Sequence, residues 1–138
     1  MKKLLTLLVL LLASYISFSQ GLNDDYTTVF NKVKNGKFTD ITFNTNDGRK
    51  WINAYSQIGW NSYGFPIDGN ICEVVILAPY SKEGVIEMIK YCNTNLVTID
   101  THNWNFYRDD GSLGRVTLVP IGPSDKTNRA LVFYFYNL

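Results

Sequence analysis

Ile-Cys-Glu-Val-Val-Ile-Leu-Ala, residues 71–78, is a nearly continuous run of aliphatic and β-branched side chains. Such a run is typical of a strand that is buried on both faces. We therefore expect residues 71–78 to form a central strand of a sheet. A turn at 79–81 follows, and Ser81 is expected to cap a helix that extends to about Asn93.

A hairpin and another helix are expected on the N-terminal side of this strand. Segments 38–44 and 49–55 flank Asp47-Gly48, and this dipeptide between two extended segments is a strong signal for a tight hairpin turn. Upstream, four apolar side chains recur at the spacing of one helical face, and Gly36 follows them. These positions are Tyr26, Val29, Phe30 and Val33, with the helix cap expected at Asn23 or Asp24.

The last third of the chain is rich in β-branched and aromatic residues. Strands are expected there at 96–100, 104–108, 113–121 and 129–136. We find no internal repeat and no linker between domains. The order of predicted elements indicates a single α+β domain over residues 20–138, with two helices packed on a mainly antiparallel sheet of five to six strands.

Residues 56–70 are predicted to form a long loop. They contain three glycines and one proline, and their apolar residues follow neither a helical nor a strand period. A loop of this length inside a compact domain is often functional. Trp51, in the strand before the loop, and Phe65, held extended by Pro66, are expected to pack inward.

The first nineteen residues have the features of an export signal. Lys2 and Lys3 precede a largely apolar run from Leu4 to Ile16, and small residues follow before Gln20. This run of 13 residues is shorter than the roughly 20 needed to span a bilayer. We therefore expect residues 1–19 to be cleaved as a signal peptide and the mature protein to be periplasmic or extracellular, without membrane insertion.

The charge balance of the mature chain argues against nucleic acid as a partner. Removal of Lys2 and Lys3 from the 13 basic residues leaves 11, against 12 acidic residues. Affinity for nucleic acids depends largely on Lys and Arg side chains that neutralise phosphates. A nearly neutral chain without a long basic cluster therefore favours other partners.

Cys72 and Cys92 are the two cysteines of the chain. Disulfides persist outside the cytoplasm, and the predicted strand and the returning helix bring both residues to the same end of the unit. A Cys72–Cys92 disulfide is therefore expected, with two separate buried thiols as the alternative.

Aromatic side chains concentrate around the predicted loop. Trp60 and Tyr63 are flanked by Gly, Asn and Ser, which are typical of an exposed turn, and Gln57 and Asn61 add amide groups. Flat rings with neighbouring amides suit a sugar, and aromatic rings with a polar atom are also frequent in protein interfaces. These four residues are our candidate ligand-binding set, and the alternative is that the rings belong to the core.

The sequence contains no motif that defines a catalytic or metal centre. Asp100 and His102 share a face if they lie on one strand, which allows a carboxylate to orient an imidazole. No nucleophile motif accompanies this pair, and one histidine with two separated cysteines does not build a zinc site. We therefore expect no catalytic residues, no metal and no cofactor.

The sequence leaves three functions open. The first is an exported, non-catalytic module that binds a protein, of the inhibitor or immunity type. The second is a carbohydrate-binding module that uses residues 56–70. The third is a small hydrolase built around Asp100 and His102.

Overall fold

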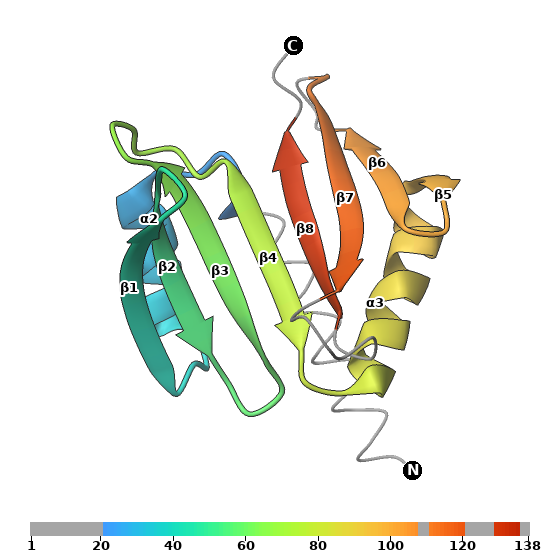
Figure 1. Ribbon diagram of the computed structural model, residues 1–138, viewed down its shortest axis with the longest axis horizontal. Helices are drawn as coiled ribbons and strands as arrows, with labels where there is room; N and C mark the ends of the chain where they lie inside the picture. The colour runs from blue at the N-terminus through green and yellow to red at the C-terminus, as the bar shows by residue number, and fades with distance from the viewer. Residues whose placement is uncertain (1–20, 108–110, 121–128, 136–138) are drawn as a thin grey trace.

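The computed structural model describes residues 21–107, 111–120 and 129–135, and these residues form one antiparallel sheet with two helices (Figure 1). The eight strands lie in the order β1-β2-β3-β4-β8-β7-β6-β5. The helices are α2 (Tyr26–Asn35) and α3 (Lys82–Asn95). The strands are β1 (Asp40–Asn46), β2 (Arg49–Tyr55), β3 (Gly59–Pro66), β4 (Val74–Pro79), β5 (Val97–Asp100), β6 (Asn103–Tyr107), β7 (Leu113–Pro120) and β8 (Arg129–Phe135).

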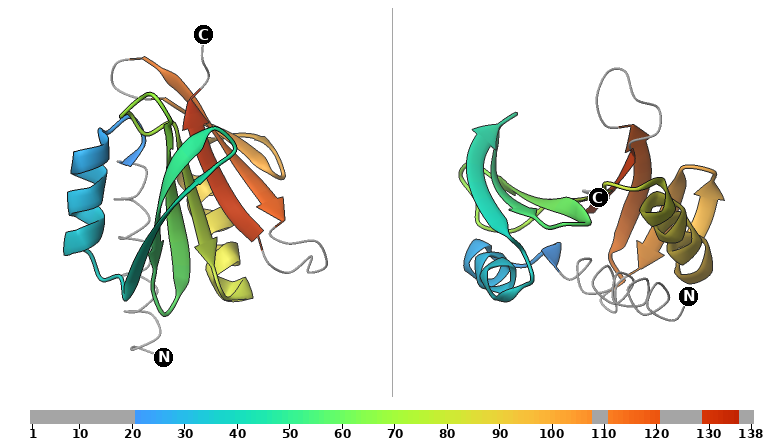
Figure 2. Two further views of the ribbon diagram at one scale, coloured as in Figure 1. Left: turned by 60° about the vertical axis from the view of Figure 1, so that its left-hand side comes forward. Right: turned by 90° about the horizontal axis from the view of Figure 1, so that it is seen from below.

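The order of elements repeats, although the sequence shows no repeat. Helix α2 and the meander β1–β4 form a first half, and helix α3 and the meander β5–β8 form a second half. The two halves join where β4 pairs with β8, from Val74 opposite Tyr134 to Leu77 opposite Leu131. Figure 2 (right) shows α2 against the first four strands and α3 against the last four.

The α+β class is confirmed, but the predicted number of strands is too low. The main difference is β3, which occupies residues 59–66 of the predicted loop. Gly59 and Gly64 therefore lie within a strand and not in a loop. A Cβ atom on Gly59 would lie 2.6 Å from the carbonyl oxygen of Ala78, so glycine is needed because the neighbouring strand approaches closely.

The strand register defines two faces of the sheet. Ile52 lies opposite Tyr63, and Tyr63 lies opposite Val75, so all three belong to one face. In the second half, Trp104 lies opposite Val116. These residues are buried in a single core cluster with residues from both helices, which are Val29 and Val33 of α2 and Val85, Met88 and Cys92 of α3. We call this side the core face and the opposite side the second face.

The predicted helix signals are confirmed with a small shift at one end. Ser81 caps α3 by accepting a hydrogen bond from the Gly84 N–H at 3.0 Å. Gly36 is the C-cap of α2, as expected, but the N-cap is Asp25 rather than Asn23 or Asp24. The Asp47-Gly48 turn forms with positive φ angles of 50° and 71°, as a tight hairpin requires.

The predicted Cys72–Cys92 disulfide is wrong, because both cysteines are free and buried. Cys92 faces the core from α3, whereas Cys72 precedes β4 and exchanges backbone hydrogen bonds with the segment before α2, through Asn23 and Asp24. A helix packed on a sheet stands about 10 Å from it, which exceeds the Cα separation of about 5.5–6 Å in a disulfide.

The predicted signal peptide, residues 1–19, lies outside the described residues. Within the described part of the chain, neither helix has the length and apolar character needed to cross a membrane.

Candidate functional site

The structure separates the four residues predicted to bind a ligand. Asn61 and Tyr63 point to the core face of β3 and are only 6% and 3% exposed. The expected exposure of Tyr63 is therefore wrong, and burial raises the pKa of its hydroxyl well above the usual range. Trp60 lies on the second face and is half-buried, and Gln57 is exposed in the turn between β2 and β3.

Of the two residues expected to pack inward, Phe65 does so and Trp51 does not. Phe65 is fully buried and meets Tyr26 of α2 edge to face, with ring centroids 5.0 Å apart. Trp51, in contrast, lies on the second face and is half-buried. Trp51 and Trp60 therefore occupy the same side of the sheet, on adjacent strands.

The second face carries a band of aromatic and aliphatic side chains. None of its residues belongs to the core cluster that contains the two described helices. Trp60 lies beside Tyr55 on β2, and aliphatic residues of β4 and β8 continue the band towards the second half. Its half-buried members are Trp51, Tyr55, Trp60, Val74, Ile76, Val132 and Tyr134.

A row of polar side chains crosses the first three strands on this face. The Asn53 amide donates to the side-chain oxygen of Asn44 at 2.6 Å, and the Ser62 hydroxyl donates to the side-chain oxygen of Asn53 at 2.5 Å. Each group in the row therefore already has a partner within the protein. The row rigidifies the surface next to the aromatic residues.

Trp51 is held against the sheet at both ends of its indole. The indole N–H donates to the carbonyl oxygen of Asn46 at 3.2 Å. At the other end, the six-membered ring occupies the space over Gly64, where a Cβ atom would lie 2.8 Å from the ring. Gly64 thus provides the room in which the indole lies.

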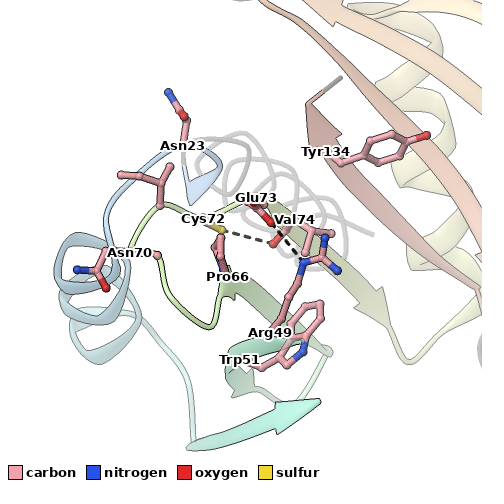
Figure 3. A pocket seen from close by; sticks show the side chains of 11 residues that line it. Asn23, Arg49, Trp51, Pro66, Asn70, Cys72, Glu73, Val74 and Tyr134 are labelled. Carbon is pink, nitrogen blue, oxygen red and sulfur yellow. Dashed lines mark hydrogen bonds and ion pairs between the residues drawn. The ribbon is translucent and has the colours of Figure 1, made fainter. Parts of the chain in front are cut away.

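A hollow of about 610 Å³ lies next to this indole, at the end of the second face. Figure 3 shows Arg49, Trp51 and Glu73 on one side of the hollow and Tyr134 on the other, with Val74 between them. The Arg49 Nε atom lies 3.5 Å from a Glu73 carboxylate oxygen. This distance places the charges together, but the buried Nε–H has no hydrogen-bond acceptor.

The arrangement of Asp100 and His102 differs from that of an acid–base pair. The Asp100 carboxylate accepts the backbone N–H of His102 at 2.8 Å and the side-chain amide of Asn103, so it stabilises the turn between β5 and β6. These hydrogen bonds, the His102 N–H first, lower the pKa of Asp100. The His102 Nδ1 atom lies 2.8 Å from the Thr101 hydroxyl rather than from the carboxylate.

The two thiols lie in apolar surroundings that suppress ionisation. Burial raises the pKa of both Cys72 and Cys92 to about 12. A nucleophilic or metal-binding cysteine needs a low pKa, so neither thiol has the environment of a reactive group. Within the described ranges, no cluster of three or more His, Cys, Asp or Glu side chains is arranged to hold a metal ion.

Comparisons with models of protein families, with curated proteins and with solved structures found no match for this chain. The description of the candidate site therefore rests on the structure of this chain alone.

The sequence contains a signal for the side of the sheet on which Trp51 lies. In β2, the buried Ile52 and Ala54 alternate with Trp51, Asn53 and Tyr55. This period of two places Trp51 and Tyr55 together on the side away from the core. By the same period, Arg49 lies on this side of β2. Glu73 and Tyr134 come near it only because segments that are distant in sequence pair into the same sheet.

Proposed function

We propose that this chain is an exported binding module without a catalytic centre of its own, and that it binds a protein of the inhibitor or immunity type. The observation that carries the proposal is the aromatic and aliphatic band on the second face. Interfaces between proteins have an apolar centre that is enriched in Trp and Tyr and surrounded by polar groups. Val74, Ile76 and Val132 supply such a centre, with Trp60 and Tyr55 next to it.

The polar row supports a protein partner over a glycan on the central part of this face. A sugar is recognised through many hydrogen bonds to its hydroxyl groups. Asn44, Asn53 and Ser62 already use hydrogen-bonding capacity on one another. The aliphatic residues beside them offer contact area and no hydrogen bonds, which suits the apolar side chains of a protein.

The test is retention of a partner from envelope extract on the immobilised mature protein, with bound proteins identified by mass spectrometry. We expect a partner that the wild type retains and that the double variant Tyr55→Ala/Trp60→Ala loses. Tyr80→Ala is the matched control, because Tyr80 is 53% exposed in the connection between β4 and α3, outside the second face. Equal retention by all three proteins, or no specific retention by the wild type, would contradict the proposal.

Export is the part of the proposal that depends on the N-terminal sequence. Intact mass of the protein recovered from the cell envelope or the medium is expected to begin at Gln20. Recovery of a chain that retains residues 1–19 would contradict cleavage of the signal.

A further inference from the structure

The hollow beside Trp51 has the dimensions of a small-ligand site rather than of a protein interface. Ligand pockets commonly measure about 300–1,000 Å³, and this hollow measures about 610 Å³. Its walls come from both halves of the sheet, since Arg49 and Trp51 belong to β2 and Tyr134 belongs to β8. A ligand in this hollow would therefore lie across the β4–β8 junction, over Val74.

Trp51 supplies an apolar surface whose position does not depend on the ligand. The hydrogen bond to Asn46 and the contact over Gly64 hold the indole in place. Preorganisation of this kind lowers the entropic cost of binding. A ligand with a flat apolar side, such as the C–H face of a saccharide ring, matches this surface.

The charges at the hollow identify the polar character of the ligand. Arg49 and Glu73 are opposite in charge, and their side chains are 40% and 45% exposed. Because the two opposite charges lie together, they largely offset each other, and the hollow has no net charge that would favour a cationic or an anionic ligand. A hydrocarbon would remove water from both charges without replacing its hydrogen bonds, which is unfavourable.

The exposed parts of both side chains suit a neutral ligand with hydroxyl groups. The 3.5 Å separation and the unsatisfied Nε–H show that Arg49 and Glu73 do not use their full hydrogen-bonding capacity on each other. A hydroxyl group donates to the Glu73 carboxylate, and a neighbouring hydroxyl accepts from the Arg49 guanidinium.

We infer that the hollow between Arg49, Trp51 and Tyr134 binds a saccharide ring, with the ring stacked on Trp51 and its hydroxyl groups bound by Arg49 and Glu73. This site differs from the residues 56–70 predicted from the sequence. It adjoins the surface proposed for the protein partner and shares Val74 with it, but Arg49 and Glu73 belong to the hollow alone, and Tyr55 and Trp60 belong to the partner surface alone.

The direct test follows backbone amide shifts of the mature, isotope-labelled protein by NMR. The probes are neutral hexoses and N-acetylhexosamines, added singly and then as oligosaccharides that contain the same units. We expect shifts that cluster at residues 49–51, 64–74 and 134. Response to single sugars indicates recognition of one ring, whereas response only to oligosaccharides indicates recognition within a glycan chain. Absence of shifts with every probe, or shifts confined to other surfaces, would overturn the inference.

Two variants test the assigned roles in the same titration. Glu73→Gln is expected to weaken binding about tenfold, as loss of a hydrogen bond to a charged group does. Trp51→Ala is expected to abolish the shifts. Glu83→Gln on α3 and Tyr80→Ala are the matched controls for charge and for aromatic loss, and both are expected to bind as the wild type does. Wild-type affinity in folded Glu73→Gln and Trp51→Ala proteins would refute the assignment. Because the partner assay uses Tyr55 and Trp60, either proposal can fail without the other.

Discussion

Gly64 affects both the packing of β3 against its neighbours and the shape of the second face. A Cβ atom there would lie 2.5 Å from a Val74 methyl group and 2.8 Å from the Trp51 ring. The hydrogen bond to Asn46 holds the indole, and the branched Val74 side chain has few rotamers, so neither neighbour can yield without a cost in stability. Because glycine has no side chain, Gly64 thus determines where the indole lies.

We predict that Gly64→Ala destabilises the protein by about 1–3 kcal/mol through overpacking. Urea denaturation followed by circular dichroism measures the change. Gly69→Ala is the control, because a Cβ atom there would approach only the Pro66 side chain, at 3.1 Å. Equal midpoints for the two variants would show that the contact over Gly64 is not tight.

The buried thiols predict loss of stability at alkaline pH. The pKa of Cys72 and of Cys92 is raised from 9.0 to about 12 in the folded protein. Between these values the unfolded chain loses thiol protons that the folded protein keeps, so the free energy of unfolding falls as pH rises. Below pH ~9 both states keep these protons, and this contribution to stability is fully present.

The measurement is the urea midpoint of wild type and of Cys72→Ala/Cys92→Ala between pH ~8 and ~11. The double variant starts less stable because two buried side chains are truncated, and its midpoint is expected to fall less with pH. A thiol reagent is expected to label neither cysteine in the folded protein and both after unfolding without reductant. A midpoint with the same pH dependence in both proteins would contradict this assignment.

At the scale of elements, local hydrogen bonds explain where the helices begin. Ser81 is in an extended conformation, and its hydroxyl accepts the Gly84 N–H. In α2, Asp25 accepts both the N–H and the hydroxyl of Thr28, at 2.9 and 2.8 Å. These bonds satisfy backbone donors that the first helical turn leaves unpaired.

We predict that Ser81→Ala lowers the free energy of unfolding by about 1 kcal/mol, because it removes this cap. Ser81→Asn is expected to retain most of the stability, since its side-chain oxygen can accept the same N–H. Thermal unfolding of the two variants provides the comparison. A Ser81→Asn protein as unstable as Ser81→Ala would indicate that the cap is not the source of the effect.

β3 shows why the element prediction failed where it did. Asn61, Tyr63 and Phe65 point to the core face, while Trp60, Ser62 and Gly64 point to the second face. The alternation is regular, but its core side includes a polar residue and its other side includes a tryptophan and a glycine. Hydrophobicity therefore does not alternate along β3, and a period of two is not visible in the sequence.

At the scale of the whole molecule, the two halves share one sheet and one core. Four residue pairs join β4 to β8, from Val74–Tyr134 to Leu77–Leu131. The core cluster includes residues of α2 and α3 together. Continuous packing across the junction is expected to make unfolding cooperative.

We predict a single unfolding transition that coincides for circular dichroism and tryptophan fluorescence. Val29→Ala in α2 and Met88→Ala in α3 are each expected to lower the same midpoint, with Met88→Ala costing about 2–5 kcal/mol. Both side chains are 1% exposed, so the comparison is matched in burial. Two transitions, each moved by one variant only, would show that the halves fold independently.

The amino-acid sequence by itself determined the class of the fold, both helices, the Asp47-Gly48 hairpin and a central strand within residues 71–78, which the structure places at Val74–Pro79 with Val74 and Ile76 half-buried. These features depend on side-chain periodicity, caps and turn residues, which act between positions close together in the chain. Only the tertiary structure decided that residues 59–66 form a strand, that the cysteines lie apart and that Trp51 and Trp60 share a face. It also brought Arg49, Glu73 and Tyr134 to one hollow. The physical reason is that strand pairing joins residues distant in sequence, and the glycines and aromatic rings of β2 and β3 acquire their roles from neighbours on other strands.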